Sequence, residues 1–237
     1  MPPCKPAAWS LDGEGLLREP RARLAGVVAA VTTRALGDMK GDAERRRAAM
    51  KAGLGGRPVH ILKQAHGSFI ARRPRAHGAP PEADGWIVRG RSGVFGVFVA
   101  DCLPLFLWPR SGEAAGVFHV GWRGAEARMP EKAVAAMRES LGIEPGELHA
   151  AIGPHIGACC YEVGDDVASR FHPAATRRRG GKPYLDLAGD VVRRLIAAGI
   201  PRARIEEGGG CTFCRNDLFY SRRRERAGHM FAFAGIA

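Results

Sequence analysis

Residues 86–120 read WIVRGRSGVFGVFVADCLPLFLWPRSGEAAGVFHV and contain four short apolar runs separated by turn residues. The runs cover residues 86–88, 94–100, 105–108 and 116–120, and Gly, Pro or Ser lies close to their ends. Strands that are covered on both faces of a sheet show such continuous apolar runs, whereas half-exposed strands alternate apolar and polar residues. The stretch therefore predicts the centre of a buried sheet.

Helical periodicity follows on the C-terminal side of this stretch. Apolar residues recur every three or four positions over 126–141 and 187–198, and Gly142 and Gly199 end the two patterns. Further strands are expected at 25–33, 59–62, 150–152, 219–220 and 230–233, and further helices at 42–51 and 163–171. This arrangement predicts an α/β (α+β) single-domain sandwich, with a mixed sheet covered by helices.

One domain accounts for most of the chain. The sequence of 237 residues contains no internal repeat and no linker long enough to divide it. Residues 1–24 hold Pro, Gly and charged residues without a clear period, so we expect a loosely ordered N-terminal arm before a domain at 25–237. Hydrophobic residues make up 46% of the chain, which is enough for a sizeable core.

The charge is strongly basic, with 36 Lys and Arg against 24 Asp and Glu, a net charge of +12. Such an excess often indicates nucleic-acid binding. Here the arginines are scattered, and the triplets at 45–47, 177–179 and 222–224 have no aromatic residues between them for stacking. We therefore expect small anionic ligands and no nucleic acid.

The expected location is the cytoplasm. Charged residues interrupt every apolar segment, so no membrane span is expected. The first residues lack the apolar core of a signal peptide. The six cysteines do not have the pattern of a small secreted framework, which favours free thiols or metal ligands. The oligomeric state stays open between a monomer and a small homo-oligomer.

Three segments carry candidate metal ligands beside Gly or Pro turn residues. They are Gln64-Ala65-His66-Gly67, Ala100-Asp101-Cys102-Leu103-Pro104 and His119-Val120-Gly121-Trp122-Arg123-Gly124. Each places an imidazole or a thiol at or near the end of a predicted strand, so the fold can bring His66, Cys102 and His119 together. Three protein ligands leave a fourth position for water or substrate, as in catalytic zinc sites. The same ligands also suit copper.

Four other cysteines have no assigned chemistry. Cys159 and Cys160 are interpreted as buried thiols. Cys211 and Cys214 form a C-x-x-C motif without a second such pair and without a thioredoxin-like context, which favours a structural role over redox chemistry.

Further segments accompany the three ligand-bearing ones in a fixed order along the chain. They are Thr32-Thr33-Arg34, Gly153-Pro154-His155-Ile156-Gly157, Cys160-Tyr161-Glu162-Val163-Gly164, Cys211-Thr212 and Phe219-Tyr220-Ser221-Arg222-Arg223-Arg224. Together the segments resemble the family once called multicopper polyphenol oxidases or laccase-domain proteins, also described as peptidoglycan editing factors. The resemblance covers roughly residues 25–235.

The resemblance implies a zinc-dependent purine nucleoside phosphorylase. Such an enzyme cleaves adenosine, inosine or methylthioadenosine with phosphate and also deaminates adenosine, so its partners are a purine nucleoside and phosphate. The zinc ligands of the family fall on His66, Cys102 and His119. The implied fold is the YfiH-like sandwich, which is related to cysteine hydrolases.

Several side chains near these ligands are further candidates for catalysis or binding. Asp101 is expected either to handle a proton and orient an imidazole in catalysis, or to cap a strand end. Arg123 is favoured for phosphate, because a guanidinium at a strand-to-helix turn binds an oxyanion through charge and bidentate geometry. Arg34, Gln64 and Tyr161 are further candidates for binding substrate or phosphate.

The chain departs from the family pattern in two places. Residues 35–41 lack the Asn that follows a Gly-rich stretch in the family, and Arg222 stands where Tyr is common. The substrate contacts of these segments therefore stay open.

Two other functions remain as alternatives. The first is a copper-dependent, laccase-like polyphenol oxidase, although eight scattered histidines provide no dense ligand set for a multicopper centre. The second is a cytoplasmic peptidoglycan-precursor editing hydrolase, with Cys102 as nucleophile and His119 as base. The sequence does not identify the preferred nucleoside or the physiological metal.

Overall fold

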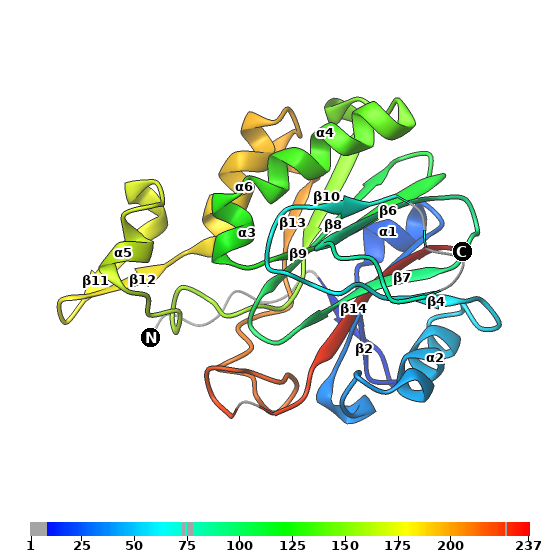
Figure 1. Cartoon of the computed structure of the whole chain (residues 1–237), viewed down its shortest axis with the longest axis horizontal. Coiled ribbons are helices and arrows are strands. Elements are labelled where there is room, and N and C mark those ends of the chain that lie inside the picture. The colour runs from blue at the N-terminus through cyan, green and yellow to red at the C-terminus, as the bar shows by residue number, and fades with distance from the viewer. Residues whose placement is uncertain (1–8, 73, 75–77, 226) are drawn as a thin grey trace.

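Two stacked β-sheets form the centre of the computed structural model, which describes residues 9–72, 74, 78–225 and 227–237 (Figure 1). The first sheet contains, in spatial order, β1 (Ser10–Leu11), β2 (Leu16–Arg18), β3 (Val27–Thr32), β14 (Met230–Ile236), β7 (Val94–Val99) and β4 (Val59–His60). The second contains β13 (Ile205–Glu207), β10 (Leu148–Ile152), β8 (Leu103–Pro109), β9 (Ala114–Val120), β6 (Gly85–Arg89) and β5 (Ile70–Ala71). Both sheets are mixed, because the edge strands β4, β5 and β13 pair in parallel with their neighbours.

Helices cover the outer faces of the two sheets (Figure 1). The second sheet is covered by α3 (Trp122–Glu126), α4 (Met129–Leu141) and α6 (Leu187–Ala197), and the first by α2 (Asp42–Lys51). Ala22 of α1 (Pro20–Leu24) is buried with the residues between the sheets, whereas α5 (Asp165–Ala168) and a hairpin of β11 (Thr176–Arg179) and β12 (Lys182–Leu185) lie outside these layers. Short 3-10 helices are η1 (Arg34–Leu36), η2 (Pro145–Glu147), η3 (Pro173–Ala175) and η4 (Arg202–Arg204).

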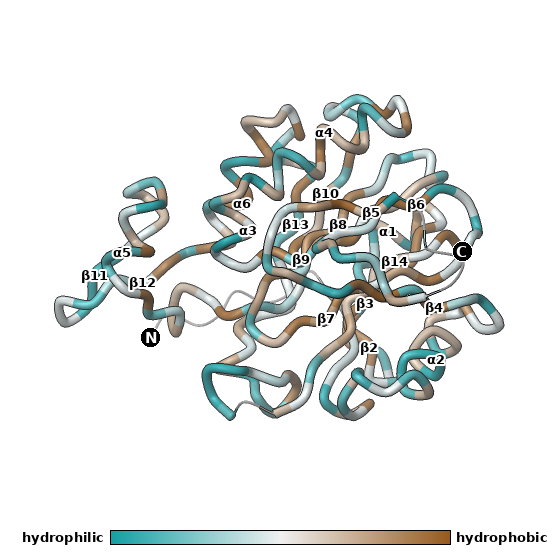
Figure 2. Tube along the Cα trace, viewed as in Figure 1, coloured by the Kyte–Doolittle hydropathy of each residue, from teal (hydrophilic) through white to brown (hydrophobic). Residues whose placement is uncertain are grey.

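Large apolar side chains fill the space between the sheets. Phe95 and Val97 come from the first sheet, and Trp86, Phe106 and Val117 from the second. Separate apolar layers lie between each sheet and its helices. Figure 2 shows the apolar residues concentrated along the central strands, with polar residues on the outward α2. The continuous apolar runs of the sequence thus belong to strands that pack on both faces.

The predicted fold class is confirmed, with two mixed sheets in place of one. The sequence pattern does not separate the two arrangements, because a strand buried between a sheet and a helix layer looks like one buried between two helix layers. No helix within the described residues is both long enough and apolar enough for a membrane span.

The prediction of a loosely ordered arm is wrong for residues 9–24, the part of it that the structure describes. Residues 1–8 lie outside the described residues, but from Trp9 onward the chain is part of the fold. Leu16 and Leu17 are buried in β2, which pairs with β3. A strand of three residues is too short to show a period in the sequence, and its neighbouring charges conceal it.

Three predicted elements differ in extent. The helix expected at 126–141 begins only at Met129, as α4, because Arg128, whose φ is 65°, separates it from α3. The helix expected at 163–171 is limited to α5. No strand is found at 219–220, where Phe219 is buried in the layer between the sheets without joining a ladder. Apolar character there reflects burial and not strand pairing.

Candidate metal centre and active site

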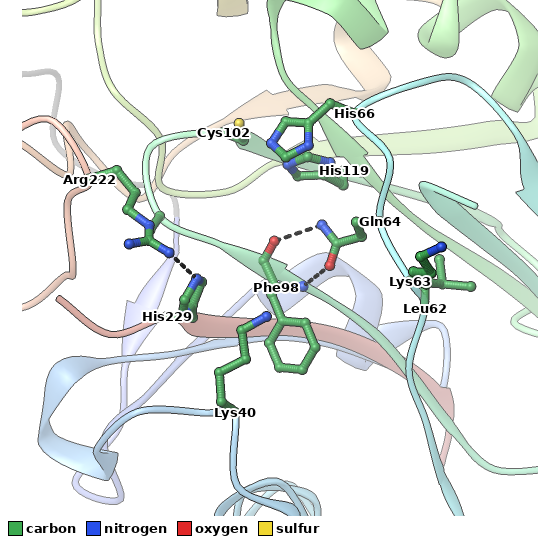
Figure 3. A pocket seen from close by; sticks show the side chains of 11 residues that line it. Lys40, Leu62, Lys63, Gln64, His66, Phe98, Cys102, His119, Arg222 and His229 are labelled. Carbon is green, nitrogen blue, oxygen red and sulfur yellow. Dashed lines mark hydrogen bonds between the residues drawn. The ribbon is translucent and has the colours of Figure 1, made fainter. Parts of the chain in front are cut away.

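His66, Cys102 and His119 lie together at one end of the stacked sheets. One ligand atom from each lies within 4.8 Å of the others, and the two imidazole rings have centroids 4.8 Å apart at 86° (Figure 3). Burial increases from the exposed His66 through the half-buried Cys102 to the buried His119. The sequence prediction that these three residues converge is therefore matched by the geometry.

Strand pairing explains why Cys102 and His119 meet. In the antiparallel pair of β8 and β9, Leu103 lies opposite Val120 and Pro104 opposite His119. Cys102, one residue before β8, therefore lies beside the end of β9. A Cβ on Gly121 would lie 3.1 Å from the Cys102 sulfur, so a larger residue there would crowd the site.

The loop that carries His66 is fixed by Gln64 and by Asp84. The Gln64 amide donates to the Phe98 carbonyl (2.9 Å) and accepts from the Phe98 N–H (2.7 Å), as a neighbouring strand would (Figure 3). Asp84 accepts hydrogen bonds from the backbone N–H groups of Ala65 (3.2 Å), His66 (3.0 Å) and Gly67 (2.7 Å). These bonds hold His66 at a φ of 59°, which is uncommon for a residue with a side chain.

Asp84 also fixes the orientation of His119. Its Oδ1 lies 2.9 Å from Nδ1 of the His119 ring, and the backbone N–H of His119 donates to the backbone carbonyl of Asp84 at 2.7 Å. An ionised carboxylate only accepts hydrogen bonds, so Nδ1 carries the proton and Nε2 is available as a ligand. Burial acts to raise the pKa of Asp84, but hydrogen bonds from His119 and the backbone hold it below its usual value.

The two histidines favour the thiolate form of Cys102. Burial acts to raise the pKa of Cys102, but the positive charge of His119 and hydrogen bonds from both histidines lower it to about 6. For His119, burial acts to lower the pKa, while Cys102 and Asp84 raise it to about 9. In the metal-free protein the pair is therefore a thiolate beside an imidazolium near neutral pH. A metal ion held by His66, Cys102 and His119 would require the neutral imidazole of His119, so it would bind in place of the proton on Nε2.

Two chambers open from the trio. The first, of about 340 Å³, includes Lys40, Phe98 and His229, and the second, of about 390 Å³, includes Trp122, Arg123, Tyr161 and Arg223. Four residues line both of them, namely His66, Ala100, Cys102 and Arg222. Each chamber is of the size that holds a small metabolite. The trio can therefore contact molecules held on either side.

The structure places the other predicted site residues in different settings. Arg123 and Tyr161 line the second chamber, with the Arg123 guanidinium 4.2 Å from the Trp122 ring. Burial raises the pKa of Tyr161 to about 12, so the phenol stays protonated and can donate. Arg34 lines neither chamber: it pairs with Glu225 and lies 4.6 Å from the Tyr220 ring.

Asp101 lines the second chamber but uses both carboxylate oxygens within the protein. Thr212 donates its hydroxyl to Oδ1 at 2.6 Å, and the Arg223 N–H donates to Oδ2 at 2.8 Å. Its φ of 84° turns the chain from β7 in the first sheet to β8 in the second. These contacts match the capping role expected as one of its two alternatives.

Sequence reasoning did not single out Asp84, Lys40 or Arg222 as site residues. Asp84 had a detectable signal, because it is an acidic residue directly before a buried strand. Lys40 lies in the segment that departs from the family pattern, and its ammonium is 4.1 Å from the Phe98 ring centroid. Arg222, the other departure, lies 3.0 Å from Nε2 of His229 (Figure 3). Both departures thus bring cations into the first chamber.

Comparison with known proteins agrees with this arrangement. The family model described as multi-copper polyphenol oxidoreductase laccase matches residues 28–237. The chain belongs to this laccase family. The resemblance found in the sequence motifs is confirmed, and the match includes all three residues of the trio.

Relatives of this laccase-family chain carry names of purine-converting enzymes. A protein of Xylella fastidiosa named purine nucleoside phosphorylase is 35% identical over 83% of this chain and 79% of its own length. The purine nucleoside phosphorylase YlmD of Geobacillus stearothermophilus is 29% identical over 97% of both chains. The adenosine deaminase RL5, from an unknown prokaryotic organism, is 34% identical over 65% of this chain and 61% of its own.

Solved structures show the same fold. The crystal structure of YlmD from Geobacillus stearothermophilus superposes with a TM-score of 0.87, at 29% identity, over 98% of this chain and 99% of that one. The Bacillus licheniformis protein YfiH gives the same TM-score at 25% identity, over 97% and 99%. The YfiH-like fold implied by the motifs is therefore confirmed.

The residues of this laccase-family site fit a single zinc ion. Two imidazoles and one thiolate are donors that zinc prefers, and three of them leave one position open. The bond between Asp84 and His119 is the outer-shell contact that commonly orients a metal-binding histidine.

Replacing Asp84 by Asn is expected to weaken zinc binding about 10- to 100-fold, as the loss of such outer-shell partners does. The amide keeps the shape of the carboxylate but no longer fixes the His119 tautomer or accepts all four N–H groups. Competition with a chelator of known affinity measures the effect. Asp217→Asn, which alters an exposed ion pair with Arg215, serves as the matched control. Equal zinc affinity in both variants would contradict the role given to Asp84.

Alkylation of the metal-free protein should report the low pKa of Cys102. Because the pKa is lowered to about 6, the thiolate persists down to that pH, and its iodoacetamide reaction slows about tenfold per unit only below it. Asp84→Asn should move the midpoint upward, since the His119 cation loses its carboxylate partner. Peptide mass spectrometry identifies the alkylated residue. A midpoint near that of an ordinary thiol would show that the trio does not stabilise the thiolate.

Proposed function

We propose that this chain is a cytoplasmic, zinc-dependent purine nucleoside phosphorylase that also deaminates adenosine. The observation that carries the proposal is the His66, Cys102 and His119 trio at the junction of two chambers. Relatives bearing the names purine nucleoside phosphorylase and adenosine deaminase support the same pair of activities.

His66, Cys102 and His119 would hold the ion. A bound zinc ion supplies Lewis acidity and lowers the pKa of water towards neutrality. The protein contributes the open side of the trio, the fixed tautomer of His119 and a thiolate that exists at neutral pH. Asp101 acts as a positioning residue, because its carboxylate holds Arg223 and Thr212 in place.

Cationic side chains offer a binding site for phosphate. Arg123 and Arg223 line the second chamber, and Arg222 lines both. A guanidinium binds phosphate oxygens through charge-assisted hydrogen bonds in a fork that fixes their direction. In phosphorolysis a phosphate oxygen forms the bond to C1′ as the bond to N9 breaks. The electron pair goes to the purine, which takes up a proton, and the products are the base and ribose 1-phosphate.

Deamination uses the same trio with water in place of phosphate. Water adds at C6 of the adenine ring, ammonia leaves with the added proton, and inosine is formed. The neutral Tyr161 phenol can donate a hydrogen bond to substrate in the second chamber, because its pKa is raised to about 12. The two reactions therefore share a site and differ in which nucleophile it holds.

A second candidate is hydrolysis by a Cys102 nucleophile, as for an enzyme that edits peptidoglycan precursors. The specific observation is the series Cys102, His119 and Asp84, in which the base is oriented by a buried carboxylate. Phenol oxidation has less support. Among the described residues, His66 and His119 are the only histidines in a candidate metal group, whereas a multicopper centre needs many more.

The zinc-loaded protein is expected to convert adenosine and phosphate into adenine and ribose 1-phosphate, and adenosine alone into inosine. Liquid chromatography of the products measures both reactions. Cys102→Ala should lose both activities together with the zinc of the trio, because it removes the thiolate ligand. Chelation should stop both reactions and added zinc should restore them. Activity that persists in a chelator but is lost on alkylation would support the cysteine nucleophile instead.

Arg123→Ala is expected to raise KM for phosphate about tenfold or more, since one charge-assisted hydrogen bond contributes roughly 1.5–3 kcal/mol. The deamination rate, which requires no phosphate, and the zinc content should stay unchanged. Steady-state kinetics with phosphate varied gives the value. Arg138→Ala, on the exposed face of α4, is the matched control. The role of Arg123 fails if both variants show the same KM for phosphate.

A further inference from the structure

A second cluster of possible metal ligands lies outside the proposed active site. The sulfurs of Cys159, Cys160, Cys211 and Cys214 all lie within 4.8 Å of one another. The sequence interpretation treated the first two as buried thiols and found no second pair for the C-x-x-C motif. The structure corrects both points, because Cys159 and Cys160 are only half-buried and form the missing pair.

We propose that these four cysteines form a structural zinc site, separate from the trio. Four sulfurs about 2.3 Å from one ion, at the corners of a tetrahedron, lie about 3.8 Å from one another. The Cys214 sulfur lies 3.7 Å from that of Cys159 and 3.4 Å from that of Cys160. The spacing is therefore close to that of a tetrahedral four-thiolate site with no open position, which is typical of structural zinc.

The backbone around the cluster is also arranged for thiolates. The Gly157 N–H donates to the Cys211 sulfur at 3.2 Å, as backbone amides do around metal-bound sulfur. A Cβ on Gly157 would lie 3.3 Å from the sulfur of Cys159, so glycine leaves room for the cluster. Cys211 itself is buried and begins a turn closed by the bond from the Arg215 N–H to its carbonyl (2.9 Å).

The position of the cluster gives the site a structural purpose. Cys159 and Cys160 lie in the loop after β10, which brings Ile156 and Tyr161 to the second chamber. Cys211 and Cys214 lie in the segment after β13, which leads to Arg222 and Arg223. An ion bound by all four sulfurs joins these two irregular segments and so stabilises the walls of the second chamber.

Zinc counting on the intact protein tests the proposal. Elemental analysis should give two zinc ions per wild-type chain, one in Cys102→Ala, and one in the double variant Cys211→Ser with Cys214→Ser. Cys102→Ala is the matched control, because it removes a thiol from the other site. Cobalt exchanged into Cys102→Ala should give the intense visible bands and sulfur-to-metal charge transfer of a four-thiolate site.

Several outcomes would overturn the proposal. One is a folded, zinc-free Cys102→Ala protein whose four clustered thiols all react freely with a thiol reagent. Another is a native mass lowered by the two hydrogens of each disulfide among these cysteines, and a third is iron in place of zinc. Because the cobalt spectrum and the zinc count of Cys102→Ala need no catalytic activity, the result is independent of the proposed function. The cobalt spectrum and the zinc count of Cys102→Ala also test the proposal if the double variant does not fold.

Discussion

The buried carboxylate of Asp84 organises the site. It accepts three backbone N–H groups of the His66 loop and the ring N–H of His119, so one side chain joins a loop to the end of β9. Burying a charge without such donors destabilises the folded protein by several kcal/mol. The four hydrogen bonds are therefore what allows an ionised Asp84 to be buried. The loop conformation, the His119 tautomer and the geometry of the trio all depend on this arrangement.

The junction between the two sheets is the second constraint. Of the three described non-glycine residues with positive φ, two lie here, His66 and Asp101. Each holds a sparsely populated backbone conformation that costs roughly 1–3 kcal/mol and persists only where surrounding bonds enforce it. Asp84 enforces the first, and the bonds of Asp101 to Thr212 and Arg223 enforce the second. The crossing from β7 to β8 thereby places Cys102 between the chambers.

The sequence predicted the features that depend on local pattern. The central strands follow from their continuous apolar runs, α6 follows from its helical period, and the trio follows from ordered motifs. The division into two sheets, the short strand β2 and the role of Asp84 depend on contacts between distant segments, which a single sequence does not display. The same holds for Lys40 and Arg222, because their segments depart from the family pattern and only the fold shows that both enter the first chamber.

These departures lie in the wall of the first chamber and not among the three ligands of the trio. The trio, Asp84 and the strand pairs around them fix the chemistry, and changes there would destroy the site. Lys40 and Arg222 instead line the wall of the first chamber, where a substitution alters charge and shape without touching the ligands. The Arg222 guanidinium contacts His229, and the Lys40 ammonium lies over Phe98, so the cations are held by neighbours and not by the trio. A substitution in this chamber can therefore change the preference for a substrate while the His66, Cys102 and His119 trio stays the same.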